Sequence, residues 1–267
     1  MISITSAQLD YWLALFVYPL ARVLGVVATM PVFNHVAIPA QARIIIGLAI
    51  SIGIAPALPP MPDVSIGSWA GMGIMAQQTL IGIVIGYTIS LAFAAIDVAG
   101  ELIGLQMGLS FAVFYDRNSS GQTPVMTEFL ALVAALVFLA MNGHLLTLQA
   151  LAESFTLLPV SATPFAAKGF ATIVSTASGI FASGLMLALP LIAALLIANI
   201  ALGVLTRVAP ALNLFAVGFP VMMLSGFAVL LLSLPLLGNA FAGLYERGFS
   251  ALGVVLRAGI AVPLSLP

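Results

Sequence analysis

Six long apolar runs limit what this chain can fold into more than any other feature of its sequence. They cover approximately residues 11–30, 44–58, 70–96, 129–150, 180–206 and 214–237. An α-helix needs about 20 apolar residues to cross the ~30 Å hydrocarbon layer of a bilayer. The runs are continuous and rich in Ala, Leu and Ile, without the alternation of apolar and polar residues that is typical of strands. We therefore predict an all-α, multi-helix membrane protein.

The scarcity of charge leads to the same prediction. Only 6% of the 267 residues are charged, whereas a soluble domain carries about 25%. The net charge of −1 argues against a nucleic-acid partner, which requires a basic face. The chain has no Cys, so disulfides, thiolate metal sites and thiol redox chemistry are excluded. Lipid or other proteins must cover much of the surface.

The ends of the runs carry less information. Asp10, with no basic residue before it, argues against a removable signal peptide, so we expect the first run to be retained. Prolines at 56, 59, 60 and 62 end the second run early, which predicts a half-span or a helix shielded by its neighbours. The Lys and Arg residues divide evenly between the two sides of a six-span layout, so they indicate no orientation.

Glycines recur at helical spacing in two places. Gly82 and Gly86 are four residues apart, as are Gly100, Gly104 and Gly108. On a helix such glycines share one face, which another backbone can approach closely. Two interpretations stay open, namely packing between subunits around a pore and ordinary helix–helix contact.

Several charged residues interrupt or flank the apolar runs. Arg22 lies near the middle of the first run, and we expect it to snorkel towards a headgroup or to pair within the bundle. Asp97 and Glu101 share a helix face, so they need water, protonation or a cation. The candidate cations are Arg22, Arg43 and Arg207. We favour ion pairing or a solvated rim, and proton coupling is the alternative.

No catalytic constellation is recognisable. The GxSxG, Walker A and HExxH motifs are absent. His35 and His144 are isolated from each other and from any carboxylate cluster, so they predict no metal site. We expect a protein that is not an enzyme and that holds no cofactor.

The segment Gln106–Gln122, QMGLSFAVFYDRNSSGQ, joins an apolar cluster to a polar stretch. Its large apolar side chains are Met107, Leu109, Phe111, Phe114 and Tyr115. Irregular backbone at membrane depth is tolerated only against protein or a water-filled cavity, and apolar side chains can close a narrow aqueous path. A plain loop with interfacial aromatics is the alternative, and the residues alone leave both open.

Three long motifs resemble hallmark segments of the FliR family (FliR/SctT) of flagellar export-gate proteins. They are GELIGLQMGLSFAVFYD (100–116), FLAMNGHLLTLQALAESFTLLP (138–159) and RVAPALNLFAVGFPVMMLSG (207–226). Weaker similarity covers RVLGVVATMPVFN (22–34) and IPAQAR (38–43). The motifs occur in the family's order and span nearly the whole chain.

The resemblance implies a FliP-like part joined to a FliQ-like helical hairpin, with broken helices, as one integral membrane domain over residues 1–267. It implies a channel-forming subunit of the flagellar type III export apparatus, in the inner membrane at the basal body. The implied partners are FliP, FliQ, FlhB, FlhA and unfolded rod, hook and filament proteins. It also favours a channel-closing role for Phe111, Phe114 and Tyr115, with Met107 and Leu109 beside them.

Two alternatives accompany this interpretation. The first is the equivalent gate subunit of a virulence type III secretion injectisome, although the wording of the motifs favours the flagellar branch. The second is an ion-coupled secondary transporter, for which Asp97 and Glu101 would carry protons. A transporter of that kind is expected to show inverted repeats, and the two halves show no convincing repeat.

Overall fold

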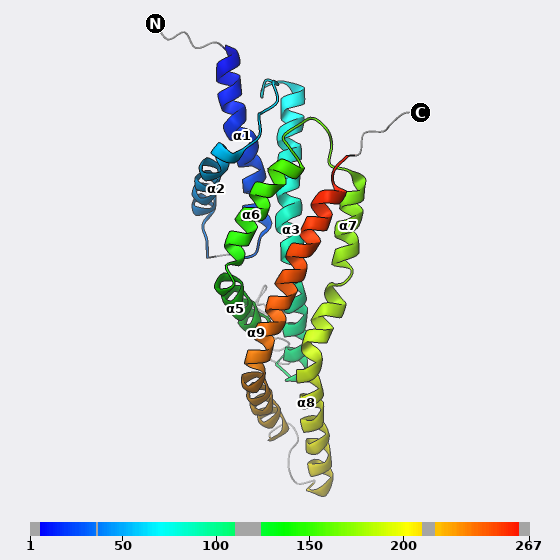
Figure 1. Cartoon of the computed structure of the whole chain (residues 1–267). Coiled ribbons are helices and arrows are strands. Elements are labelled where there is room, and N and C mark those ends of the chain that lie inside the picture. The colour runs from blue at the N-terminus through cyan, green and yellow to red at the C-terminus, as the bar shows by residue number, and fades with distance from the viewer. Residues whose placement is uncertain (1–5, 36, 110–123, 210–216, 262–267) are drawn as a thin grey trace, which may run out of the picture. The chain divides into compact units, whose positions relative to one another are not determined.

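The computed structural model describes residues 6–35, 37–109, 124–209 and 217–261. In these ranges every regular element is helical, which confirms the all-α fold class (Figure 1). The elements are α1 (Ser6–Thr29), α2 (Ala40–Ile54), η1 (Ala55–Ala57), α3 (Trp69–Gln106), α5 (Val125–Ala140), α6 (Gly143–Leu157), α7 (Ala167–Ala177), α8 (Ile180–Val208) and α9 (Phe219–Ala258).

Within the described ranges, five helical stretches are long and apolar enough to cross a membrane. A sixth is added if α5 and α6 together form one interrupted span. The apolar run over 129–150 predicted one unbroken helix, but the structure interrupts this helix at Met141 and Asn142. Asn142 has a φ of 57°, a left-handed conformation that Asn adopts more readily than most residues because its short polar side chain can bond locally. Broken helices, which the family resemblance implied, are therefore present.

Two helices are longer than the apolar runs that predicted them. α3 has 38 residues and α9 has 40. The last apolar run ends near residue 237, whereas α9 continues through Glu246 and Arg247 to Ala258. A drop in hydropathy does not end a helix, and the Leu, Ala, Glu and Arg residues of this stretch are good helix formers.

The chain divides into two compact units, each built from discontinuous segments. Unit 1 contains residues 1–91, 142–177 and 247–267, and unit 2 contains residues 92–141 and 178–246. α3 and α9 each contribute residues to both units.

Close backbone contacts organise unit 1. α1 packs against α2 and also against α3, where glycines let the two backbones meet. A Cβ atom on Gly25 would lie 2.5 Å from the carbonyl oxygen of Thr79, and one on Gly82 would overlap the carbonyl oxygen of Arg22. A Cβ on Gly86 would overlap the hydroxyl of Thr29. These glycines are therefore required where α1 crosses α3.

Three aromatic rings form the centre of unit 2. Phe93 of α3 lies 5.5 Å from Phe138 of α5 and 5.0 Å from Tyr245 of α9, measured between ring centroids. All three side chains are buried, and the Tyr245 hydroxyl donates a 2.8 Å hydrogen bond to the carbonyl of Ala134. α8 packs against α3 at Gly184, where a Cβ would lie 2.7 Å from the carbonyl oxygen of Ala95.

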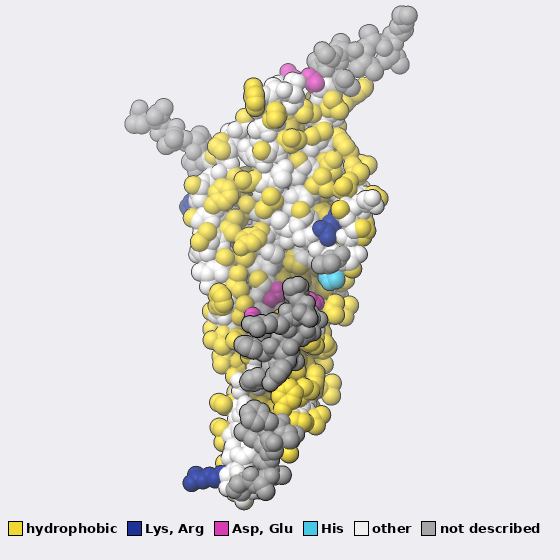
Figure 2. All heavy atoms as spheres, turned by 180° about the vertical axis from the view of Figure 1, so that it is seen from behind, with side chains coloured by type: hydrophobic (Ala, Val, Ile, Leu, Met, Phe, Trp, Pro, Cys, Tyr) yellow, Lys and Arg dark blue, Asp and Glu magenta, His cyan; other side chains and the backbone are white. Residues whose placement is uncertain are grey.

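Large apolar side chains also cover the outside. Figure 2 shows them over much of the visible face, with charges only in isolated spots. Ile45 of α2 is 64% exposed, Ile197 of α8 is 69% exposed and Leu232 of α9 is 80% exposed. Soluble monomers rarely expose apolar patches of this extent. The surface is that of a membrane protein. Within the described chain α2 buries only Gly47 and Ser51 and leaves most of its other side chains exposed or half-buried.

Candidate functional site

Two groups of residues stand out, and both contain residues singled out from the sequence. The first is the α3 terminus, which comprises Gly104 to Leu109 in unit 2. The second is the Arg22 cluster in unit 1, which comprises Arg22 and the side chains bonded to it.

A glycine-dependent cap ends α3. The backbone N–H of Leu109 donates to the carbonyl of Gly104 at 3.0 Å, and the N–H of Gly108 donates to the carbonyl of Leu105 at 3.0 Å. Gly108 has a φ of 78°, as the left-handed residue of this Schellman arrangement requires. The structure thus places Gly108 after the helix and not on its packing face. It turns the backbone out of α3 at the start of the predicted channel-closing segment.

Met107 anchors this turn. Its side chain is fully buried and packs against Gly226 of α9, where a Cβ would lie 2.5 Å from the Met107 Cε atom. Leu109 is half-buried. Phe111, Phe114 and Tyr115 lie outside the described residues.

The second glycine row of α3 meets α5. A Cβ on Gly100 would lie 2.7 Å from the Cα atom of Thr127, and one on Gly104 would lie 3.3 Å from the Cβ of Met126. Together with the α1 contacts of Gly82 and Gly86, these distances place both rows against helices of the same chain.

The acidic pair of α3 lies at the surface of unit 2. Asp97 and Glu101 are both exposed, and so is Arg207 in the last turn of α8. Neither carboxylate is buried within unit 2. The roles predicted for the pair, an ion pair or a solvated rim with proton coupling as the alternative, stay predictions.

Arg22 is in the opposite situation, since it is fully buried within unit 1. Its Nε donates to Gln78 Oε1 at 2.8 Å, and Nη2 donates to the same oxygen. Nη1 donates to Ser154 Oγ at 3.0 Å, and Nη2 donates to the carbonyl of Leu158 at 2.7 Å. The guanidinium carbon lies 3.9 Å from the centroid of the Phe155 ring. Arg22 does not snorkel.

All of these acceptors are neutral. A buried charge without a counter-ion costs several kcal/mol, and hydrogen bonds to a charged group return about 1.5–3 kcal/mol each. The cation–π contact with Phe155 adds to this. The Arg22 cluster therefore ties α1 to α3, α6 and the connection that follows α6.

Sequence reasoning did not find the partners of Arg22. Gln78 and Ser154 are 56 and 132 residues away from it. The one available signal was the glutamine pair at 77–78 inside an apolar run. No periodicity links that pair to Arg22, because the contact is made by the fold.

The part of the chain that the structure describes contains no group of three His, Cys, Asp or Glu residues able to hold a metal ion. The α3 terminus is a fixed helix end, and the Arg22 cluster surrounds a buried charge with neutral hydrogen-bond acceptors.

Comparison with known proteins gives one family. The model for bacterial export proteins, family 1, matches residues 13–248. The flagellar biosynthetic protein FliR of Pectobacterium carotovorum subsp. carotovorum is 43% identical over 96% of this chain and 98% of its own length. FliR of Escherichia coli strain K12 is 40% identical over the same shares. FliR of Bacillus subtilis strain 168 is 28% identical over 81% of this chain and 84% of its own.

Proposed function

We propose that this chain, which belongs to the bacterial export proteins, family 1, is a channel-forming subunit of the flagellar type III protein export apparatus. The family match over residues 13–248 is the observation that carries the proposal. It also confirms the resemblance seen in the three sequence motifs. The relatives named above share a flagellar name, which favours the flagellar apparatus over a virulence injectisome.

Several properties of the fold support a role within an assembly. The helices expose more apolar surface than a soluble monomer does, and α2 and α8 each present such a face. We infer that lipid covers part of this surface and that partner subunits cover the rest. The proposed partners are FliP and FliQ in the gate, with FlhB and FlhA beside it, in the bacterial inner membrane at the flagellar basal body. Residues 1–267 would act there as a single membrane domain.

We further propose that the segment after the α3 terminus closes the resting channel. Met107 is buried against Gly226 and Gly108 turns the chain out of the helix, so the segment begins from a rigid point. In this arrangement Met107 acts as the anchor, while Phe111, Phe114 and Tyr115 supply the seal. Unfolded rod, hook and filament proteins would pass when the seal opens. The proposed role is not enzymatic.

Genetic complementation tests the function. Cells that lack the gene should neither swim nor secrete flagellin, and the wild-type gene should restore both. A deletion strain that still assembles filaments would contradict the proposal.

Permeability tests the seal. Replacing Phe111, Phe114 and Tyr115 by Ala should make the assembled gate leaky to small ions, because a narrow apolar closure would widen and become wetted. Phe181→Ala on α8, which removes an aromatic side chain that is 75% exposed, is the matched control and should leave permeability unchanged. Wild-type permeability of the triple variant in an assembled gate would remove the sealing role.

The transporter alternative has its own test. Asp97→Asn combined with Glu101→Gln should disturb assembly more than proton flux if the pair is a solvated rim. A fully assembled complex that had lost only proton coupling would favour the transporter.

A further inference from the structure

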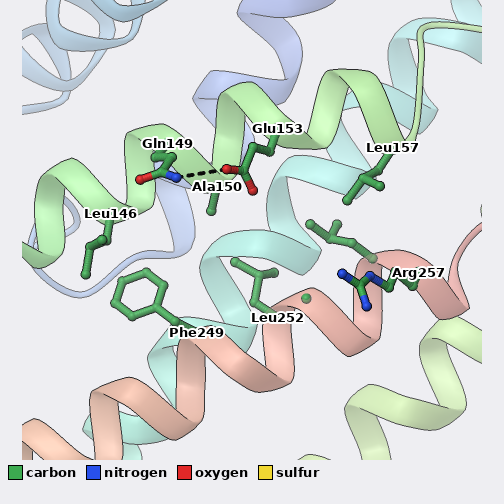
Figure 3. A pocket seen from close by; sticks show the side chains of 10 residues that line it. Leu146, Gln149, Ala150, Glu153, Leu157, Phe249, Leu252 and Arg257 are labelled. Atoms are coloured by element: carbon green, nitrogen blue, oxygen red, sulfur yellow. Dashed lines mark hydrogen bonds between the residues drawn. The ribbon is translucent and has the colours of Figure 1, made fainter.

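A notch between α6 and the C-terminal part of α9 lies wholly within unit 1. It encloses about 240 Å³. Figure 3 shows Leu146, Ala150 and Leu157 of α6 facing Phe249 and Leu252 of α9. Its floor is buried, since Leu252 is only 1% exposed. The notch is smaller than the ~300–1,000 Å³ of small-molecule sites, and it suits one large apolar side chain.

Opposite charges stand on the two walls of the notch. Glu153 belongs to the α6 wall and Arg257 to the α9 wall, and both side chains are exposed (Figure 3). Glu153 accepts a 2.9 Å hydrogen bond from the Nε2 atom of Gln149. Within the described chain no hydrogen bond or ion pair holds the guanidinium of Arg257. Each wall thus offers a charge to an incoming group of the opposite sign.

The polar rim distinguishes a protein occupant from an acyl chain. Gln149 and Glu153 on α6 and Arg257 on α9 are all exposed around the notch. Covering a charged side chain with hydrocarbon costs about 2.5–3.5 kcal/mol even on the lowest scales. A helix from a protein can instead pair these groups while its apolar side chain fills the notch. The charges thereby favour a protein.

We propose that the notch receives a helix of a partner subunit of the export assembly. That helix inserts one Leu, Met or Phe side chain above Leu252, and it carries a basic residue that meets Glu153 and an acidic residue that meets Arg257. Two opposite charges on facing walls fix the direction of the bound helix, because the reversed orientation would place like charges together. The inference rests on the proposed function for the existence of partner subunits.

The absence of Cys from the chain makes a direct test possible. Gly253 lines the notch, and a Cβ added there would meet nothing within 4 Å. A benzophenone maleimide attached to Gly253→Cys in bacterial membranes should therefore cross-link to one protein chain. The cross-linked peptide should be helical, with an acidic and a basic residue flanking an apolar one.

Charge reversal then tests the specificity. Arg257→Glu should lower the cross-linking yield about tenfold or more, because like charges across an interface cost several kcal/mol. Arg247→Glu is the matched control, since it reverses an exposed arginine of the same helix that does not line the notch, and it should leave the yield unchanged. Reversing the acidic residue of the cross-linked helix to Lys should restore the yield in the Arg257→Glu background.

Three results would overturn the inference: cross-linking to lipid alone, cross-linking to nothing, or a cross-linking yield that Arg257→Glu leaves unchanged. Failure of the proposed function looks different. Deletion cells that still swim, with charge-dependent cross-linking intact, would refute the flagellar role and leave the docking site standing.

Discussion

The Arg22 cluster yields the sharpest prediction, which concerns Gln78→Leu. Gln78 Oε1 is the acceptor for two N–H groups of the buried guanidinium. Each hydrogen bond to a charged group contributes about 1.5–3 kcal/mol, so the substitution should cost about 3–6 kcal/mol. Leucine is similar in size to glutamine, so it leaves no room for a water molecule to replace the lost acceptor. The loss of stability should therefore lie towards the upper end of this range.

Thermal stability of the detergent-purified complex, followed by size-exclusion chromatography, measures this cost. For chains of 150–250 residues, 1 kcal/mol corresponds to about 2–4 °C, so Gln78→Leu should lower the midpoint by about 6 °C or more. Gln77→Leu is the matched control on the same helix. It removes one hydrogen bond, which the Nε2 atom of Gln77 donates to the carbonyl of Thr163, worth about 0.5–1.5 kcal/mol.

A third variant separates charge from packing. Gln78→Glu keeps an acceptor facing Arg22 and replaces the Nε2 group, which is buried without a partner. It should lose less stability than Gln78→Leu. If Gln78→Leu proves no more damaging than Gln77→Leu, the charge of Arg22 must be stabilised by something other than Gln78, and the reasoning fails.

Three further predictions concern two glycine contacts and one buried hydrogen bond. Gly82→Ala should lower the free energy of unfolding by about 1–3 kcal/mol or more, because its Cβ would overlap a backbone carbonyl of α1. Gly73→Ala, with open space at that position, should leave stability unchanged or raise it by up to about 1 kcal/mol. Gly226→Ala should destabilise by pressing on Met107 and should raise ion leakage, and Met107→Ala in the same chain should relieve the clash; additive losses would refute the contact. Tyr245→Phe should cost about 0.5–1.5 kcal/mol in thermal stability by removing a 2.8 Å buried hydrogen bond.

The limits of sequence reasoning are clearest at helix ends. The apolar runs predicted helices correctly, because burial of backbone polar groups in lipid leaves few alternatives. The end of the last apolar run did not predict the end of α9, because the helix continues well past its apolar stretch. The apolar runs also passed over the break at Asn142, although an Asn-Gly pair is a recognised turn signal. Hydropathy reports the solvent around a helix, whereas its ends depend on caps and neighbours.

The glycine rows show the same division. Spacing alone put Gly82, Gly86, Gly100 and Gly104 on helix faces, and the structure showed that α1 and α5 of the same chain occupy them. Gly108 fitted the spacing but serves as a helix cap. A four-residue period is a property of the helix, whereas the identity of the partner is a property of the fold.

The sequence by itself determined that this chain is helical, apolar outside as well as inside, and related to export-gate proteins, because composition, run length and long motifs are local properties. Only the tertiary structure decided what surrounds Arg22, where Met107 is held, and which walls form the charged notch. Those arrangements join residues up to 136 positions apart, and such distant pairs are chosen by packing free energy, which no local pattern encodes.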